Sequence, residues 1–546
     1  METELKLLVN AAHLEKIVSQ AIMRELARGD LVEQRLLAHY FDSAGRKLRR
    51  KGLTLRVRQE GGQALQTLER TAPEAAPSGS LARGEWQTEV EKMWPDLRKL
   101  ANEETLPRKQ RKVLLQLRGA DKLAEQFQVE VARKTLMLEI GGSSVEMALD
   151  DGKVVAAGES RRFCEVELEL KAGKKSALYA AARHLARHVP AQISFVSKAD
   201  RGFALLGEAA APVKAVPVAF PVDASVEQGM RRIFAACLVH AQANVAGFLH
   251  SDDVEYLHQL RVGMRRFKSA LKLFRDLVTL PPELREQLEE LSSLLGAARD
   301  ADVLLLSTLA DLNGAEKQTQ PLHALLEHAA RHAAERRAAA REALHSTRHA
   351  QLMIALFEWV DCKRWRRDVS KQERQRLRSP LAGYAHHAVI AAHALVARRA
   401  GKVRDEQREE KPNEKREEKR DAQRDDKPDD GGAARSLHRL RIAGKQSRYA
   451  VDFFTDIERP HRAEKYIRQL TRTQDALGAV NDVSVARHTL AEFASADPAL
   501  GEQVDAVVDQ LDAIERKAMG ATDAPWRKLG KSSTSMLVKR LVRDPG

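Results

Sequence analysis

The sequence is poor in the features that mark a secreted, zinc-finger or membrane protein. Its 546 residues include three cysteines, Cys164, Cys237 and Cys362, too widely separated for a disulfide framework or a zinc site. We see no stretch approaching the roughly 20 apolar residues of a membrane span. The N-terminal METELKLLV lacks the basic segment and apolar core of a secretory signal. These absences predict a cytoplasmic protein with no membrane partner.

Charge is abundant and mostly positive. Charged residues make up 31% of the chain, hydrophobic residues 43%, and the formal net charge is +14. This composition indicates a globular protein, and the positive excess favours an acidic partner. Residues 401–432 are the exception, because they mix both charges with almost no apolar side chains. Such a run cannot bury a core, so we predict a charged disordered insertion.

Two stretches in the C-terminal half share one pattern, LHQLRVGMRRFKSALKLF at 257–274 and LHRLRIAGKQSRYAVDFF at 437–454. In the first, helical spacing puts Leu257, Leu260, Met264, Phe267, Leu271 and Phe274 on one apolar face. A second face is basic, and no carboxylate interrupts it. We call these faces the basic stripes: His258, Arg261, Arg265, Lys268 and Lys272, and then His438, Arg441, Lys445 and Arg448.

A second motif repeats at nearly the same interval, LGAARDADV at 295–303 and LGAVNDVSV at 477–485. We therefore predict an internal duplication, with two helical halves related by a pseudo-two-fold axis. The alternative for any single basic residue is a solvated helix face. Metal binding by His258 and His438 is disfavoured because neither helix offers a second ligand four residues on. A further basic row, Lys465, Arg468 and Arg472, extends the predicted surface.

The first 208 residues have mainly the alternating pattern of strands. Besides Met1–Asn10, the candidates are Leu36–Asp42, Leu53–Glu60, Ala64–Arg70, Gly84–Val90, Phe127–Ile140, Val145–Asp150 and Phe163–Lys171. So many strands with few crossover helices favour a mostly antiparallel sheet or barrel. A Pro/Ala-rich linker at 209–222 ends this region.

Several of these strands carry charge on one face. Glu2, Glu4 and Lys6 share a face, as do Glu165 and Glu167, because side chains alternate along a strand. A solvent-facing strand has the same pattern, but several such strands together favour a lumen with carboxylates facing cations. Divalent cations suit the carboxylates, and phosphate oxygens suit guanidinium and ammonium groups.

These residues resemble a CYTH domain, the family of triphosphate tunnel metalloenzymes, over roughly 1–208. The resemblance is carried in family order by E-x-E-x-K at 2–6, Arg56-x-Arg58, the segment 83–86 (RGEW), the strand 165–171 and the segment 197–202 (SKADRG). It implies an eight-stranded antiparallel β-tunnel. The implied activities are hydrolysis of inorganic triphosphate or thiamine triphosphate, or class IV adenylate cyclisation.

The resemblance also assigns residues. It implies Mg²⁺ or Mn²⁺ held by Glu2, Glu4, Glu85, Asp150, Glu165 and Glu167. It implies triphosphate held by Lys6, Arg56, Arg58, Arg133, Lys198 and Arg201. The catalytic set would be Glu2, Glu4, Lys6, Arg56 and Arg58.

One position departs from the family pattern. The family usually ends its central strand in Q-T-L-K, and here residues 66–69 read QTLE. A lumen lysine would thus be Glu69. A one-residue bulge would bring Arg70 into the lumen instead; otherwise triphosphate binding loses a cation.

The helical half resembles a CHAD domain over 223–535, with halves at about 223–400 and 433–535. The resemblance is carried by the two basic-stripe segments and by the repeated LGAARDADV motif. It implies two four-helix bundles and binding of inorganic polyphosphate through the basic stripes. Nucleic acid is the competing partner, but few aromatic residues lie near the stripes for base stacking, so we expect no sequence-specific binding.

The sequence thus predicts a multidomain α+β protein, with a β-tunnel followed by a pair of helical bundles. We expect a metal-dependent triphosphatase that binds polyphosphate and is associated with polyphosphate granules. Two alternatives remain open: a catalytically weak or inactive polyphosphate-binding protein, and an adenylate cyclase.

Overall fold

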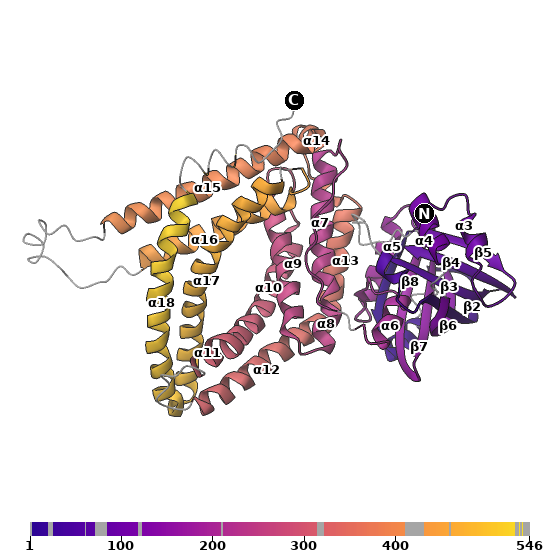
Figure 1. Cartoon of the computed structure of the whole chain (residues 1–546), viewed down its shortest axis with the longest axis horizontal. Coiled ribbons are helices and arrows are strands. Elements are labelled where there is room, and N and C mark those ends of the chain that lie inside the picture. Colours follow the sequence, from indigo (N-terminus) through magenta and orange to yellow (C-terminus); the bar gives the residue numbers. More distant parts are fainter. Residues whose placement is uncertain are drawn as a thin grey trace, which may run out of the picture.

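The computed structural model has a sheet region and a larger helical region, side by side (Figure 1). It describes residues 3–19, 26–60, 62–70, 84–117, 123–208, 211–313, 322–409, 431–457, 460–529, 534 and 538. Glu2 and Arg83 lie outside these residues. So does the central part of the expected insertion, residues 410–430. The helices on either side of that part reach into the 401–432 range, ending at Glu409 and beginning at Gly431.

In the described residues, a single nine-stranded antiparallel sheet forms the N-terminal region, in the order β5-β4-β3-β2-β6-β7-β8-β1-β9. The predicted fold class is confirmed, but this part of the chain shows nine strands rather than eight. The extra strand, β9, has two residues, too few for an alternating pattern. The strands are β1 (Glu4–Val9), β2 (Ala27–Ser43), β3 (Leu53–Glu60), β4 (Gln63–Arg70), β5 (Glu85–Val90), β6 (Leu123–Ile140), β7 (Ser143–Ala156), β8 (Glu159–Ala172) and β9 (Gln192–Ile193).

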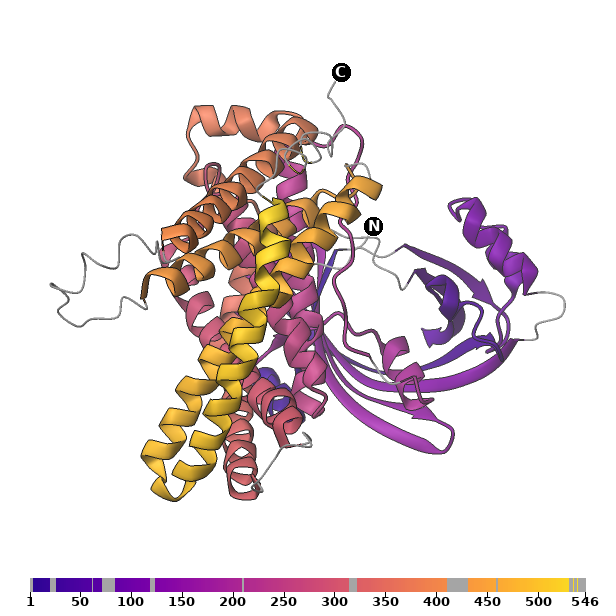
Figure 2. The ribbon, with the colours of Figure 1, turned by 60° about the vertical axis from the view of Figure 1, so that its left-hand side comes forward.

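The sheet curves strongly, so its two faces have different surroundings (Figure 2). The outer face is apolar and is covered by α1 (Ala11–Ser19), α3 (Leu97–Ala101), α4 (Arg108–Gln116) and α5 (Ser176–Ala186). The inner face carries the charged residues described below. At one end it is closed by α6 (Lys198–Leu205), whose Phe203 packs with Phe127 of β6. A short 3₁₀ turn, η1 (Arg49–Lys51), precedes β3.

The helical region begins at α7, and its internal duplication remains a prediction. The first half contains α7 (Val226–Ala243), α8 (Val245–His250), α9 (Val254–Leu273), α10 (Pro282–Val303), η2 (Leu304–Leu309), α11 (Ala310–Asn313), α12 (His323–His345), α13 (Thr347–Asp361), η3 (Arg364–Arg367) and α14 (Lys371–Arg378). The helices that follow are α15 (Leu381–Glu409), α16 (Gly431–Phe453), α17 (Pro460–Ala496), η5 (Pro498–Leu500) and α18 (Gly501–Leu529). Although α15 begins before residue 400, it packs along α16.

The described residues of the two halves meet at several places. Near the centre, Arg266 of α9 forms an ion pair with Asp452 of α16. At the far end, Leu325 of α12 shares an apolar cluster with Leu490 and Phe493 of α17 and Val507 of α18. The basic stripes lie on α9 and α16, so the Arg266–Asp452 ion pair joins the two helices that carry them.

One expectation about hydropathy is wrong. Residues Val226–His250 are long and apolar enough to cross a membrane, judged by length and composition. This segment comprises α7 and α8, and 61% of its apolar window is buried inside the protein.

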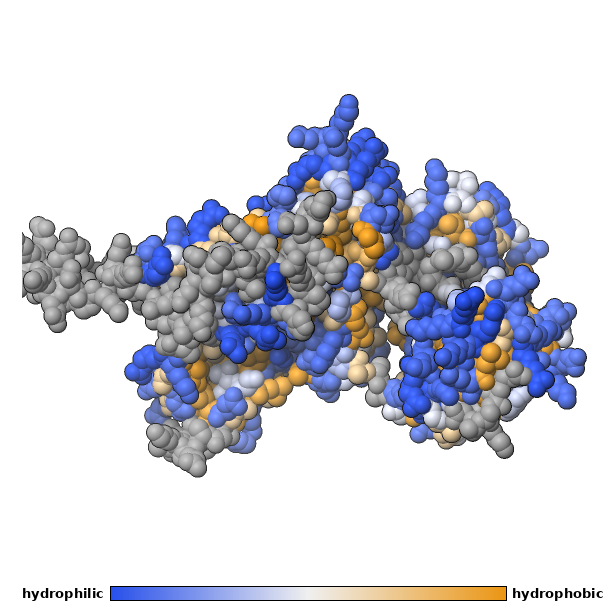
Figure 3. Space-filling view, turned by 45° about the horizontal axis from the view of Figure 1, so that its top comes forward, coloured by the Kyte–Doolittle hydropathy of each residue, from blue (hydrophilic) through white to orange (hydrophobic). Residues whose placement is uncertain are grey.

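Hydrophilic side chains cover much of the visible described surface of both regions, with smaller hydrophobic areas between them (Figure 3).

The sheet region and the helical region share one apolar core. α5 lies between them, because it covers the outer face of the sheet and also packs against α13. Buried polar contacts reinforce this seam: the Tyr179 hydroxyl donates to Asp361, and Gln242 Nε2 donates to the Ile193 carbonyl at 2.8 Å. The regions are therefore held in a defined relative position.

The seating of α6 on the sheet gives a stability prediction. A Cβ atom at Gly202 would lie 2.2 Å from the Phe127 ring, which is itself buried. Gly202→Ala should therefore lower the free energy of unfolding by about 1–3 kcal/mol, because overpacking displaces α6. Urea unfolding followed by circular dichroism would measure the loss.

Gly45→Ala is the matched control in the same region, since its Cβ would meet its nearest neighbour, Arg50, at an ordinary 3.5 Å. Equal stability of the two variants would contradict the close packing of α6.

Candidate functional site

Three carboxylates converge on the inner face of the sheet. Asp150 of β7 lies opposite Glu165 of β8 in the antiparallel register, and Glu167 follows two residues later on the same face. One carboxylate oxygen from each residue lies within 4.8 Å of the others. Asp150 and Glu165 are fully buried. We call these three residues the carboxylate cluster.

Cations surround the carboxylate cluster. The Lys198 ammonium, at the start of α6, lies 2.8 Å from Asp150, 2.6 Å from Glu165 and 2.9 Å from Glu167. Arg133 of β6 donates from Nε and Nη2 to the two oxygens of Asp150, both at 2.7 Å, and from Nη2 to Glu167 at 2.5 Å.

Two further cations reach the same carboxylates. The ammonium of Lys6 on β1 lies 3.0 Å from Glu167 and 3.5 Å from Glu165. Arg201 of α6 lies 3.3 Å from Glu165. Four predicted phosphate-binding residues and three predicted metal ligands therefore form one buried network.

Mutual attraction keeps these buried groups charged. Burial by itself would raise the pKa of Glu167, but Lys198, Lys6 and Arg133 outweigh it and hold that pKa well below its usual range. Burial would likewise lower the pKa of Lys198, but Glu165, Glu167 and Asp150 keep it well above the ordinary lysine value. The network therefore holds fixed opposite charges at neutral pH.

A second charged group lies on β3, β4 and β5. Arg56 of β3 contacts Glu69 of β4 at 3.0 Å and Glu85 of β5 at 3.5 Å. Arg56 and Arg58 share one face of β3 by alternation, whereas Leu55 and Val57 point into the outer apolar cluster. We call Arg56, Glu69 and Glu85 the arginine wall.

Tyr40 of β2 lies between the arginine wall and the carboxylate cluster. Burial raises the pKa of its phenol; Arg56, Glu69 and Lys198 all lie close enough to affect it. Sequence reasoning missed this residue, because an aromatic side chain in a strand is most often part of the core. In the folded chain Tyr40 is 4% exposed, and its hydroxyl lies near Arg56.

Glu69 occupies the lumen, and the proposed bulge is absent. β4 pairs with β3 and β5 in an unbroken register, in which Glu69 lies opposite Thr54 and Glu85 and Arg70 lies opposite Leu53. Alternation therefore directs Arg70 to the other face. The hypothesis that a bulge brings Arg70 into the lumen is wrong. Arg56 is paired with a carboxylate where the family pattern has a lysine.

Glu4 lies at the edge of the carboxylate cluster. It shares the inner face of β1 with Lys6, and its charge helps to raise the Lys6 pKa. Glu85 belongs to the arginine wall rather than to the carboxylate cluster.

The residues fit a divalent cation with one qualification. Oxygen ligands from Asp150, Glu165 and Glu167 are the donors that Mg²⁺ and Mn²⁺ prefer. However, the Lys198 ammonium contacts all three carboxylates. The cluster therefore fits a metal ion only when Lys198 lies elsewhere.

The basic stripe of α9 lines a cavity of about 380 Å³. Arg261, Arg265, Lys268 and Lys272 contribute to its wall, together with Ser292 of α10 and Gln446 of α16. The predicted apolar face of this helix is confirmed, with all its members buried except the half-buried Leu271. The packing therefore presents the stripe toward a hollow between the two halves.

The two stripes converge in space. Arg265 Nε of α9 donates to the Tyr449 hydroxyl of α16 at 2.8 Å. Burial, with Arg441 and Arg265 nearby, lowers the pKa of Lys445 to about 8. Burial also lowers the pKa of His258, so this histidine is neutral at physiological pH. An anion at this junction would encounter cations from both copies of the repeat.

Carboxylates do reach the stripes, from outside their own helices. Arg261 contacts Asp300 at 3.2 Å, and Asp482 lies near Arg441 and Lys445. Asp300 and Asp482 are the equivalent aspartates of the duplicated LGAARDADV and LGAVNDVSV motifs. The sequence showed that each stripe lacks acidic residues within its helix, but the facing helix could not be identified from spacing alone.

The remaining predicted residues are more exposed. Lys268, Lys272 and His438 are exposed, and Arg448 is half-buried above the Tyr449 ring. Lys465, Arg468 and Arg472 lie on the exposed face of α17, where Arg468 contacts Glu464 at 3.8 Å. That contact fits the solvated-face alternative for Arg468.

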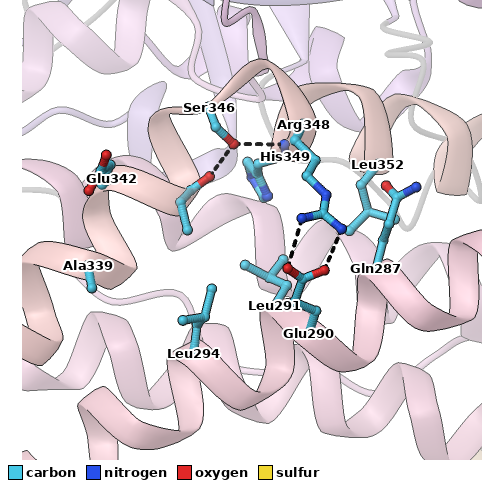
Figure 4. A pocket seen from close by; sticks show the side chains of 11 residues that line it. Gln287, Glu290, Leu291, Leu294, Ala339, Glu342, Ser346, Arg348, His349 and Leu352 are labelled. Carbon is cyan, nitrogen blue, oxygen red and sulfur yellow. Dashed lines mark hydrogen bonds and ion pairs between the residues drawn. The ribbon is translucent and has the colours of Figure 1, made fainter.

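A separate cavity of about 340 Å³ lies between α10, α12 and α13 (Figure 4). Apolar residues such as Leu291 and Leu352 line it, with the Arg348–Glu290 ion pair on one wall. Burial lowers the pKa of His349, which also lines this cavity, to about 4. The cavity contains none of the residues predicted from the sequence to be functional.

Comparison with known proteins gives two family matches: the CYTH domain model matches residues 1–203, and the CHAD domain model matches residues 232–491. The chain is 29% identical over 170 residues to the inorganic triphosphatase of Haemophilus influenzae, which covers 30% of this chain and 44% of that protein. The match therefore spans less than half of that relative's length.

Two solved structures are also similar. The CHAD domain from the plant Ricinus communis has 32% identity and a TM-score of 0.46, covering 58% of this chain and 96% of that one. HpAC1 from Hippeastrum, described as having a dominant triphosphatase activity, has 16% identity and a TM-score of 0.27. It covers 39% of this chain and 98% of that one.

Proposed function

Because the chain belongs to the proteins in which a CYTH domain precedes a CHAD domain, we propose that it hydrolyses inorganic triphosphate and binds inorganic polyphosphate. The observation that carries the first part is the buried carboxylate cluster with four cations around it. Such a network is costly to bury unless a ligand uses it. We place both activities in the cytoplasm, where polyphosphate granules would concentrate the protein.

In this proposal the chain's own residues position the substrate. Lys6, Arg133 and Arg201 would hold the phosphate oxygens by charge-assisted hydrogen bonds. Asp150, Glu165 and Glu167 would hold Mg²⁺ or Mn²⁺, which when bound neutralises phosphoryl charge and polarises the terminal group. Water attacks the terminal phosphorus and the P–O anhydride bond breaks, giving orthophosphate and pyrophosphate. Positioning and charge neutralisation supply most of the acceleration.

The carboxylate cluster can be tested with two neighbouring residues of β7. Asp150→Asn should lower kcat/KM for tripolyphosphate by at least about 100-fold, because it removes a buried carboxylate from the cluster. Asp151→Asn should leave kcat/KM nearly unchanged, because Asp151 points the other way and pairs with the exposed Arg162. Phosphate release with Mg²⁺ and with Mn²⁺ is the measurement.

Equal loss in the two variants would remove the cluster from the mechanism. A folded wild-type protein without turnover in either metal would reject the hydrolase proposal. Running the same assay with thiamine triphosphate, ATP and long-chain polyphosphate would define the substrate, and cyclic AMP from ATP would favour the cyclase.

The second candidate is a polyphosphate-binding protein whose tunnel is weak. The contact between Arg56 and Glu69 favours it, because that carboxylate neutralises a cation expected to bind phosphate. Glu69→Lys should lower the KM for tripolyphosphate by at least about 10-fold, because a repulsive charge becomes an attractive one. The KM of Glu69→Gln should lie between the KM of the wild type and that of Glu69→Lys. An unchanged KM in both variants would show that Glu69 does not limit binding.

Polyphosphate binding should depend on pH through Lys445. Its pKa in the free protein is about 8, and a bound polyanion stabilises the ammonium form and raises that pKa. Affinity should therefore be constant below about pH 7 and fall by up to about 10-fold per pH unit above pH 8. Lys445→Met should bind polyphosphate more weakly than the wild type at pH 7, and its affinity should not fall as the pH rises above 8. Isothermal titration with long-chain polyphosphate at constant salt would measure it.

The basic stripes can be tested by the same titration. Arg261→Ala/Arg441→Ala removes one equivalent cation from each half and should weaken binding by at least about 10-fold. Arg348→Ala is the control, because Arg348 belongs to neither stripe and is paired with Glu290. Equal affinity of the double variant and the wild type would reject the assigned surface.

A further inference from the structure

The Lys198 ammonium contacts all three members of the carboxylate cluster. It donates to Glu165 at 2.6 Å and to Glu167 at 2.9 Å, and it lies 2.8 Å from an oxygen of Asp150. Lys6 differs, because its ammonium reaches two of these carboxylates, at 3.0 and 3.5 Å. Lys198 is thus placed where a divalent cation bound by the same oxygens would lie.

The backbone of Lys198 is fixed, whereas its side chain can exchange partners. Ser197 caps α6: its hydroxyl accepts from the Asp200 N–H at 3.0 Å, and Asp200 accepts from the Ser197 N–H at 2.9 Å. Arg49 contacts Asp200 at 2.6 Å and ties this turn to the end of the sheet. The four-carbon stem beyond Cα has rotatable bonds that can redirect the ammonium.

Each half of the contact is less stable alone. Arg133, Lys6 and Arg201 still contact the carboxylates when Lys198 leaves, but the one cation that touches all three is lost, so their mutual repulsion increases. An ammonium in the same buried setting is costly without an anion. A divalent cation would satisfy the carboxylates, and a phosphate would satisfy the ammonium, so the two ligands replace both halves of the contact together.

We propose that Lys198 is a tethered cation that occupies the carboxylate cluster in the ligand-free protein and moves to the triphosphate when a metal ion takes its place. This inference rests on the proposed triphosphate site. It makes metal binding and triphosphate binding depend on each other. A metal ion alone would leave the Lys198 ammonium without an anion, and triphosphate alone would draw Lys198 away and leave the carboxylates without that cation. Because such coupling is reciprocal, each ligand should tighten the binding of the other.

The test is direct binding of Mn²⁺ to the full chain at pH 8, without triphosphate, by isothermal titration and electron paramagnetic resonance. Lys198→Met should bind Mn²⁺ at least about 10-fold more tightly than the wild type. Lys6→Met should gain less, because Lys6 contacts fewer of the carboxylates. Adding Asp150→Asn to Lys198→Met should abolish the gain and so locate the ion at the cluster.

Lys198→Gln is the second variant in case the methionine prevents folding, because its amide can still donate to a carboxylate. The proposal is overturned if a folded Lys198 variant binds Mn²⁺ no more tightly than the wild type, or if the gain survives Asp150→Asn. A non-hydrolysable imido analogue of tripolyphosphate should increase the Mn²⁺ affinity of the wild type more than that of the variant. Since no readout requires turnover, lack of hydrolysis would reject the proposed function and leave this inference intact.

Discussion

Charge compensation inside the sheet is the constraint on which the N-terminal domain depends. Asp150, Glu165 and Glu167 can be ionised and buried together only because Lys198, Lys6 and Arg133 contact them. The cations come from β1, β6 and α6, which are far apart in the chain. The curvature of the sheet and the seating of α6 are therefore conditions for the network, since a small displacement would leave buried charges unpaired.

The need to keep these charges in contact also explains why the two faces of the sheet carry different kinds of residue. On β8, Val166 and Leu168 point outward into the core shared with the helices, while Glu165 and Glu167 point inward. One strand thus links the candidate site to α5, and α5 packs against α13 of the helical domain. The apolar face anchors the strand, and this anchoring keeps the inner carboxylates in place.

In the helical domain, duplication creates one surface from two copies. Each copy supplies a basic stripe and an aspartate from its LGA motif, and Arg265 and Tyr449 join the copies across the seam. Burial and neighbouring cations lower the pKa of Lys445 to about 8, so positive charge at this seam is already concentrated in the free protein. A linear polyanion would relieve that repulsion along several contacts.

The sequence by itself determined the fold classes and which faces of the strands and helices carry charge, because both follow from local periodicity. Leu53–Glu60 is a strand with the predicted bounds, and the apolar face of 257–274 is buried as its spacing required. Local periodicity did not predict every strand or strand end. The two-residue β9 is too short for a periodic pattern, and β7 extends to Ala156, beyond the predicted end at Asp150.

Only the tertiary structure decided which charges meet. It placed Glu69 beside Arg56, and Tyr40 between the arginine wall and the carboxylate cluster. It also placed Lys198 in contact with three carboxylates and Asp300 in contact with Arg261. The physical reason is that an ion pair depends on distance and burial between elements far apart in the chain. Periodicity predicts the face of a strand or helix on which a side chain lies, but it does not predict which residue of another element contacts that side chain.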